Sequence, residues 1–430
     1  MNQLGQPGFG KVALLYLFGT ALALYPPLSQ FAMPFIGVGF LLILAVVCFG
    51  IFFAGRPIRN TVLYRLVGVL LFVHVGWVFL AVLYGNDLAF IGQDSMGFLI
   101  YLLCPVLYVF IEAHGLHQHF VRFLLNLCTF LALVSAAIIT WYYLTFGAVE
   151  SDSLLLMNAF IKSRNLNWQI DNNNGFLGLY TFTGHLLLLG IGLAYYRYYQ
   201  SGNVKFGYLI LLYCFGIFSD GHRALVIALA ILILLLFPLL CKTMRVKRVL
   251  LYLALLIVPV LLYFAVDFAW VIARFDFTLD DPSTVERLSQ VPALLERIVE
   301  RPLMGNGFGS YASVIRSPER PFSYEVDFLA TIMKLGIVGS VLYFGAYLAM
   351  LEVARRQAGV LGYILFCVGL AFLFYMGTNG NSAMSTDSSV FHMFIFLLIA
   401  LSVERTASTS RYALEYRRRT QGPSMAALKS

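Results

Sequence analysis

The sequence predicts an all-α membrane protein with about twelve transmembrane helices. Of its 430 residues, 60% are hydrophobic and only 12% are charged, and the mean hydropathy is +0.83. Apolar runs of about twenty residues recur along the whole chain, the length that an α-helix needs to cross the hydrocarbon core of a bilayer. This composition excludes a soluble globular protein. We expect one integral membrane domain over residues 1–430, because no internal repeat or low-complexity linker divides the chain.

The expected spans follow these apolar runs in order along the chain. The runs lie at 12–30, 34–54, 63–84, 96–112, 123–147, 175–196, 206–219, 224–241, 249–272, 326–351, 360–377 and 388–403. Two longer polar segments separate them, one at 148–174 and one at 273–325. We expect these two segments to lie outside the membrane as loops.

Loop charges orient the spans, because Lys and Arg in short loops stay on the cytoplasmic side. With the N-terminus inside, the cytoplasmic side collects most of the 29 basic residues and few of the 21 acidic ones, including the segment KTMRVKR and the tail at 404–430. We therefore expect both termini to be cytoplasmic. The net charge of +8 then comes mainly from this side, where anionic lipid headgroups are a sufficient partner. Nucleic acid is not implied.

The long outer loop, residues 273–325, contains a predicted surface helix. The stretch STVERLSQVPALLERIVERP places its leucine and isoleucine residues at helical spacing, and Pro302 follows as a stop. An amphipathic helix on the membrane surface is the simplest interpretation. The next stretch, GNGFGS at 305–310, has alternating glycines but no expected strand before it. We therefore expect a tight loop and not a dinucleotide-binding fingerprint.

Arginine residues gather on the outer side, against the usual charge rule. Arg223 follows a Gly-His pair at the outer end of one span, and its outer companions are Arg164, Arg287, Arg297, Arg301, Arg316 and Arg320. A lone arginine at a helix end is usually a snorkelling anchor, and several of these residues will pair with acidic neighbours. Guanidinium groups also hold phosphate oxygens by paired hydrogen bonds. We expect some of these arginines to bind a phosphorylated ligand.

Two carboxylates, Glu325 and Asp327, stand at the start of the span at 326–351. They are open to three interpretations: favourable charges at a helix N-terminus, a metal site, or a general base beside the arginines. Residues two apart in a helix point about 200° apart, so both would hold one ion only in an extended segment.

The sequence gives no sign of the usual soluble-enzyme chemistries. It has no Walker loop, HExxH, CxxC pair or GxSxG elbow. The six cysteines fall in or beside the expected spans, which indicates core residues and not a metal site or a disulfide framework. We expect neither a metal nor a cofactor.

From roughly Gly175 onward, the chain resembles the bacterial O-antigen ligase and polymerase superfamily of membrane glycosyltransferases. The stretch FSDGHRALVIALAI is similar to the family's Ser-Arg element at the outer start of a helix, with His222 where Ser is usual and Arg223 matching. The stretch STVERLSQVPALLERIVERPLMGNGFGSY resembles the family's surface helix and the glycine turn after it. Arg287 matches the arginine of that helix, and Arg301 replaces a common Asn.

The chain departs from the ligase pattern at one position. Ligases of this family carry a His and then an amide residue shortly before a Gly-x-x-Gly pair. Counting back from Gly336 and Gly339 places Glu325 at the His position and Val326 at the amide position. A ligase without its His lacks the residue that activates the acceptor, so the resemblance favours a polymerase. Arg164 also precedes a glycine at the spacing found in arginine loops of some O-antigen polymerases.

The resemblance implies a GT-C-like fold and an enzyme of the bacterial inner membrane whose active site is periplasmic. It would polymerise glycan repeat units carried on undecaprenyl pyrophosphate, with the bilayer and a chain-length regulator membrane protein as further partners. Glu325 would be the base, and Arg223, Arg287 and Arg164 would bind the pyrophosphate. Secondary candidates are His222, Arg301, Arg320, Asp327 and Tyr324.

Two alternative functions remain open from the sequence. An O-antigen ligase would transfer the glycan to lipid A core, with Glu325 in place of the ligase His. A lipid-linked glycan flippase or transporter would also suit about twelve spans with both ends inside. Secondary transporters usually show internal repeats and broken helices near the midplane, whereas polarity here is concentrated in the outer loops.

Overall fold

The computed structural model of the chain is helical over most of the residues that it describes. Its helices are α1 (Phe9–Ser29), α3 (Thr61–Leu83), α4 (Leu88–Ala113), α5 (His117–Phe146), α7 (Leu186–Ser201), α8 (Lys205–Asp220), α9 (Arg223–Thr243), α12 (Pro282–Glu300), α13 (Asp327–Gln357), α14 (Gly359–Thr378) and an unlabelled helix, Ser389–Val403. The described residues are 8–29, 61–146, 158–159, 169–173, 176–180, 184–220, 222–243, 282–315, 318, 320–378, 389–403 and 406.

Several of these helices are suited to a bilayer. Within the described residues, five are long and apolar enough to cross a membrane: Arg65–Leu83, His117–Trp141, Arg223–Leu240, Asp327–Gln357 and Gly359–Gly377. Shorter apolar helices occur at Phe9–Thr20, Leu103–Ala113 and Ser389–Val403. The chain is thus a helical membrane protein, as its composition predicts. The expected spans at 34–54 and 249–272 lie outside the described residues, and the count of about twelve stays a prediction.

One short β-hairpin interrupts the otherwise helical structure. Strand β1 (Gln169–Asn173) pairs antiparallel with β2 (Phe176–Tyr180), so the expected span at 175–196 begins too early. The helix in that region, α7, starts only at Leu186. The missed signal is the Asn-Gly pair at 174–175, which favours a tight hairpin turn between flanking strands.

Helix α4 also differs from its prediction, since it starts at Leu88 and not near residue 96. The carboxylate of Asp87 accepts hydrogen bonds from the backbone N–H groups of Ala89 (2.7 Å) and Phe90 (3.3 Å). This N-cap satisfies donors that the helix start would otherwise leave unpaired. The extra turns bring Asp94 into the helix, where it becomes part of the site described below.

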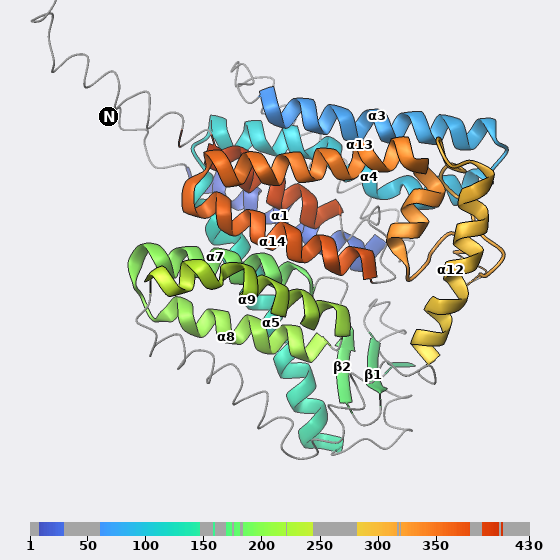
Figure 1. The fold of residues 1–430 in the computed structure, drawn as a ribbon. Helices are drawn as coiled ribbons and strands as arrows, with labels where there is room; N and C mark the ends of the chain where they lie inside the picture. The colour runs from blue at the N-terminus through green and yellow to red at the C-terminus, as the bar shows by residue number, and fades with distance from the viewer. Residues whose placement is uncertain are drawn as a thin grey trace, which may run out of the picture.

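Most helices run side by side along one direction, which is horizontal in Figure 1. Helix α13 packs against α14 and α3, and α14 packs against α7 and α9. Helix α12 lies across the right-hand end of this bundle and packs on α13. Its position confirms the predicted helix in the long loop and places it at one end of the spans.

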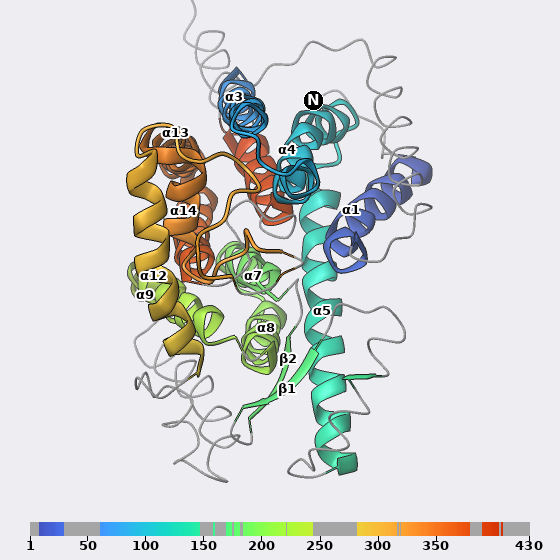
Figure 2. The same cartoon turned by 90° about the vertical axis from the view of Figure 1, so that its right-hand side faces the viewer.

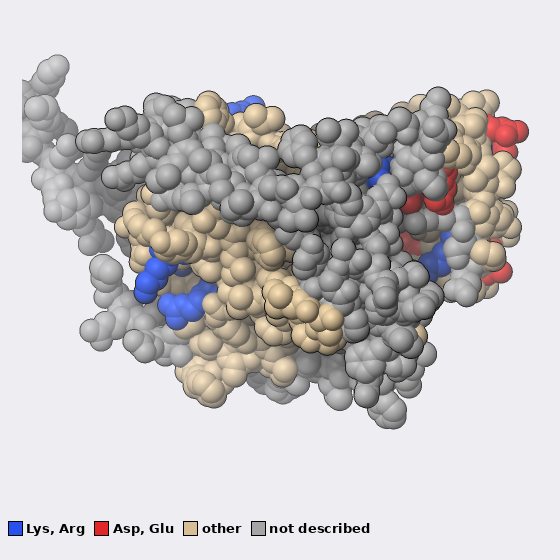
Figure 3. Space-filling view, turned by 90° about the horizontal axis from the view of Figure 1, so that it is seen from below, with Lys and Arg blue, Asp and Glu red and all other residues tan. Residues whose placement is uncertain are grey.

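We call the right-hand end of the bundle in Figure 1 the outer end. It carries α12, the α3–α4 turn and the start of α13, whereas the α7–α8 and α13–α14 turns lie at the opposite end. Figure 3 shows Asp and Glu atoms mixed with Lys and Arg atoms at the right, and Lys and Arg atoms alone at the left. Which end of the bundle faces out of the cell stays a prediction from the loop charges.

Candidate functional site

Helix α13 is broken near its outer end, and this break shapes the site. Gly336 has φ +64° and ψ −176°, which are not helical values. The loop at 301–310 fills the break with backbone hydrogen bonds. The N–H groups of Asn306 and Gly307 donate to the carbonyls of Met333 (2.8 Å) and Lys334 (2.9 Å).

Two bonds run the other way across the same break. The N–H groups of Ile337 and Val338 donate to the carbonyls of Pro302 (2.9 Å) and Leu303 (3.1 Å). The loop therefore replaces the helical hydrogen bonds that α13 lacks here, as buried backbone groups require. This confirms the tight loop that the GNGFGS stretch predicts; in the described structure helix α12, not a strand, precedes it.

The alternating glycines of this loop are required by its backbone. Gly305, Gly307 and Gly309 have φ values of 71°, 80° and 72°, a region that only glycine adopts without strain. A Cβ atom at Gly307 would lie 2.6 Å from the Cα of Ala81 in α3. The glycines thus let the loop lie directly on the neighbouring helices.

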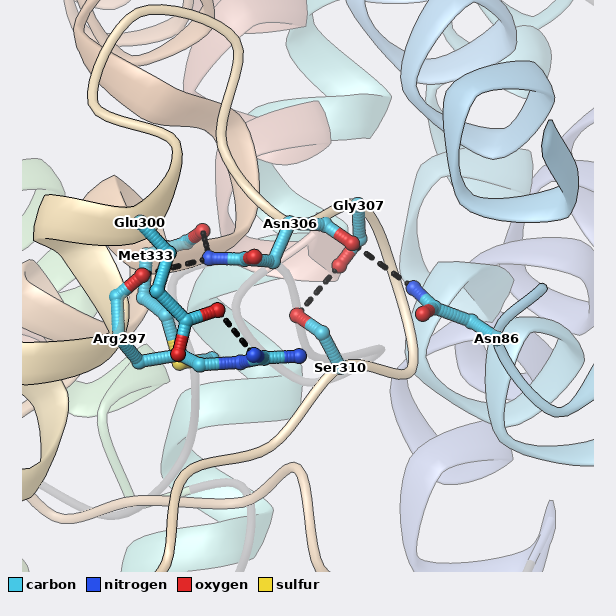
Figure 4. Close-up of polar contacts among 7 residues, drawn as sticks. All are labelled: Asn86, Arg297, Glu300, Asn306, Gly307, Ser310 and Met333. Carbon is cyan, nitrogen blue, oxygen red and sulfur yellow. Dashed lines mark hydrogen bonds and ion pairs between the residues drawn. The ribbon is translucent and has the colours of Figure 1, made fainter. Parts of the chain in front are cut away.

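Groups from α3, the α3–α4 turn and α12 hold the loop in place, as Figure 4 shows in part. Asn86 Nδ2 donates to the carbonyls of Asn306 (2.8 Å) and Phe308 (2.9 Å), and Trp77 Nε1 donates to the carbonyl of Met304 (2.7 Å). Asn306 Nδ2 donates in turn to the carbonyl of Arg297 in α12 (2.8 Å). The loop is therefore the junction between the surface helix and the bundle.

Arg301, one of the secondary candidates, lies at the start of this loop. Its guanidinium stacks over the Tyr84 ring, 3.6 Å from the ring centroid. This cation–π contact explains the side chain's position structurally. The structure places Arg301 beside the α3–α4 turn.

A buried ion pair crosses the same region and was missed by sequence reasoning. Lys334 Nζ donates to Asp94 Oδ1 at 2.7 Å, and both side chains are 2% exposed. The other carboxylate oxygen of Asp94 accepts from the Gly309 N–H at 2.9 Å. The sequence signal was Lys334 inside an apolar run, because such a charge requires a partner within the membrane domain.

Glu325, the predicted base, contacts Arg287, a predicted phosphate ligand. Arg287 Nε donates to Glu325 Oε2 at 2.7 Å; the carboxylate side chain is 10% exposed and the arginine side chain 35%. Arg287 comes from α12, and Glu325 lies just before α13. Among the described residues, the terminal nitrogens of Arg287 have no hydrogen-bond acceptor. The guanidinium can therefore hold the carboxylate and still bind a second anion.

The remaining residues around Glu325 are more buried. Gln290 of α12, which sequence reasoning missed, accepts a hydrogen bond from the Glu325 backbone N–H at 2.9 Å. Tyr324, a secondary candidate, accepts one from the Ala312 N–H at 2.6 Å. Tyr324 is fully buried, and this burial raises its pKa. Its hydroxyl thus fixes the loop and faces no solvent.

Asp327 begins α13 and is buried, with 1% exposure. The intervening Val326 has φ −95° and ψ 70°, so the helical angle expected between Glu325 and Asp327 does not apply. No group of three or more metal-ligating side chains occurs in the described part of the chain.

Arg223 and His222 lie at the same end of the bundle as Glu325. His222 Nδ1 contacts the carboxylate of Asp220, and its ring meets Tyr375 of α14 edge-on at 6.4 Å. The end of α14 also packs on the start of α13, because a Cβ at Gly377 would lie 1.8 Å from the Phe328 ring. The end of α14 thus separates the Arg223 region from the Glu325 region.

The remaining two arginine candidates are Arg320 and Arg164. Arg320 is exposed, and its carbonyl accepts from the Ser323 N–H at 3.1 Å in a turn before α13. Arg164 lies outside the described residues. The structure therefore brings together Arg287 and Glu325, and places Arg223 across the end of α14 from them.

Comparison with known families supports the same region. Residues 208–344 match the model of the family described as O-antigen ligase. The match includes Arg223, Arg287, Glu325 and the glycine loop, and it confirms the resemblance to the O-antigen ligase and polymerase superfamily. It supports a membrane function of the O-antigen ligase and polymerase type, in a glycosyltransferase-like enzyme. No curated protein matches this chain.

Proposed function

We propose that the protein polymerises lipid-linked glycan repeat units at the outer face of the bacterial inner membrane. The donor is a growing glycan on undecaprenyl pyrophosphate, and the acceptor is a sugar hydroxyl of a single lipid-linked repeat unit. The contact between Arg287 and Glu325, 2.7 Å long, carries this proposal. It joins a proton acceptor to a group suited to bind pyrophosphate.

The proposed reaction is a glycosyl transfer without a covalent enzyme intermediate. The acceptor oxygen forms a bond to the anomeric carbon of the donor, and the bond from that carbon to the pyrophosphate oxygen breaks. The bonding electrons leave with the lipid pyrophosphate, while the hydroxyl proton passes to the carboxylate of Glu325. The products are a lengthened lipid-linked glycan and free lipid pyrophosphate.

Arg287 serves two partners in this mechanism. Its Nε holds the Glu325 carboxylate, and its terminal nitrogens bind the oxygens of the leaving pyrophosphate. Negative charge builds up on that group in the transition state, so a fixed cation there lowers the barrier. Because one guanidinium contacts both groups, it also sets the base near the leaving group.

Arg223 and Arg164 are the further pyrophosphate ligands of the proposal. Arg223 begins α9 at the outer end, across the end of α14 from Glu325. The arginines together take the place of a divalent ion, so the reaction is proposed to be metal-independent.

O-antigen ligase activity is a second candidate, because the matched family model carries that description. In that case lipid A core is the acceptor, and Glu325 takes the role of the ligase His. The two activities share donor, base and leaving group. They differ only in the acceptor.

The test supplies purified protein with lipid-linked repeat units alone. A polymerase forms a ladder of longer lipid-linked glycans, and Glu325→Gln, which keeps the shape of the side chain, slows ladder formation by about two to four orders of magnitude. A ligase forms product only after lipid A core is added. The absence of product under both conditions, from protein that is folded in the membrane, would refute the proposal.

A further inference from the structure

Gln290 is a buried polar residue of α12 that the proposed reaction does not yet use. Its side chain has 0% exposure, and the buried residues that follow on α12, Ala293 and Leu294, are apolar. Its Oε1 accepts from the Glu325 N–H, whereas its Nε2 has no hydrogen-bond partner among the described residues. An amide buried with an unpaired donor lowers stability. Packing alone therefore does not explain a glutamine here.

Gln290 and Arg287 hold Glu325 from two directions. They are three residues apart in α12, so they lie on one side of that helix. Arg287 holds the carboxylate at 2.7 Å, and Gln290 holds the backbone N–H at 2.9 Å. Val326, the N-cap of α13, makes no side-chain cap hydrogen bond. The start of α13 is thus fixed by α12 and not by its own cap.

We propose that Gln290 is a positioning residue, which sets the backbone at Glu325 so that the carboxylate reaches the acceptor hydroxyl. This inference rests on the proposed role of Glu325 as the base. A base must lie within hydrogen-bond distance of the proton that it removes, and a displacement of about 1 Å can lower turnover about a hundredfold. Loss of the hydrogen bond from the Glu325 N–H to Gln290 leaves the backbone at Glu325 free to move.

The test is a double-mutant cycle between Gln290→Met and Glu325→Gln. Methionine matches glutamine in length but accepts no comparable hydrogen bond. Gln290→Met should lower kcat for polymerisation about tenfold to a hundredfold and leave KM for the lipid-linked donor nearly unchanged. In protein that already carries Glu325→Gln, it should lower kcat by less than about twofold, because the base that it positions is gone.

Leu294→Ala is the matched control, since Leu294 is buried in the same helix, one turn further on. Its effect on kcat should be the same whether Glu325 is present or replaced. If Gln290→Met lowers kcat by the same factor in the wild type and in Glu325→Gln, the inference is overturned and Gln290 is only a structural residue. The inference is also overturned if Gln290→Met has a normal kcat while Glu325→Gln loses most of its activity. That result would leave the proposed function unchanged. Full activity of Glu325→Gln would refute both this inference and the proposed role of Glu325 as the base.

Discussion

Replacement of Lys334 by Met should strongly destabilise the protein, because it leaves a buried carboxylate without its cation. Lys334 Nζ lies 2.7 Å from Asp94 Oδ1, with both side chains 2% exposed. At that distance the attraction is about 6 kcal/mol if the effective dielectric constant is about 20. Desolvation of both charges offsets much of this gain, but loss of one partner alone typically costs about 3–5 kcal/mol. Among the described residues, the Gly309 N–H is the remaining partner of Asp94 in the variant.

The double variant Asp94→Asn with Lys334→Met separates charge from packing. Asparagine keeps an acceptor for the Gly309 N–H, and no buried charge remains. Thermal unfolding in detergent should therefore give a melting temperature for the double variant above that of Lys334→Met and close to that of the wild type. Arg355→Ala is the control, since it breaks an exposed ion pair with Glu352 and should change melting little.

Two results would refute this reasoning about the buried pair. One is a melting temperature for Lys334→Met equal to that of the wild type, which would mean that water or another group compensates Asp94. The other is a double variant that melts below Lys334→Met. In that case the side-chain volumes, and not the charges, would determine stability at this junction.

Four further predictions address the site and the topology. Arg287→Ala and Arg223→Ala should each lower turnover about a hundredfold, with little recovery by Lys, in assays of ladder formation; full activity would remove that residue from the site. Glu325→Gln should lower turnover by about two to four orders of magnitude, while Asp327→Asn should have a milder effect, because Arg287 contacts Glu325, and EDTA should have no effect; inhibition by EDTA that added metal reverses would favour a metal site. Gly307→Ala should lower the melting temperature, because its φ of 80° and the nearby Ala81 backbone disfavour a side chain; an unchanged melting curve would contradict the close packing. Tags at Arg164 and Arg316 should be labelled from the periplasm and tags at Arg245 and Arg418 should not, and inverted labelling would exclude a periplasmic active site.

The sequence predicts individual elements of this fold better than their contacts. Helical spacing is visible in 283–302 because one face repeats within a few residues, and the structure has α12 there. Its crossing of the bundle end depends on packing with α13, which no local pattern encodes. The hairpin at 169–180 was missed because its apolar residues were assigned to the following span.

Site residues were likewise predicted singly and not as pairs. Glu325 and Arg287 each stand out by charge and by resemblance, but they are 38 residues apart in the chain. Only the return of α12 over the start of α13 brings them together. Gln290 carries no charge and fits the pattern of an ordinary helix face, so no feature of the sequence distinguishes it.

The break at Gly336 divides α13 into a short outer part and a long inner part. The outer part, Asp327 to Leu335, is joined to the inner part partly through the loop at 301–310, by four backbone hydrogen bonds between loop and helix. Substitutions in the loop should therefore change the direction of the outer part relative to the inner part. Under the proposed function, this loop therefore helps to orient the Glu325 carboxylate as well as to join the two parts of α13.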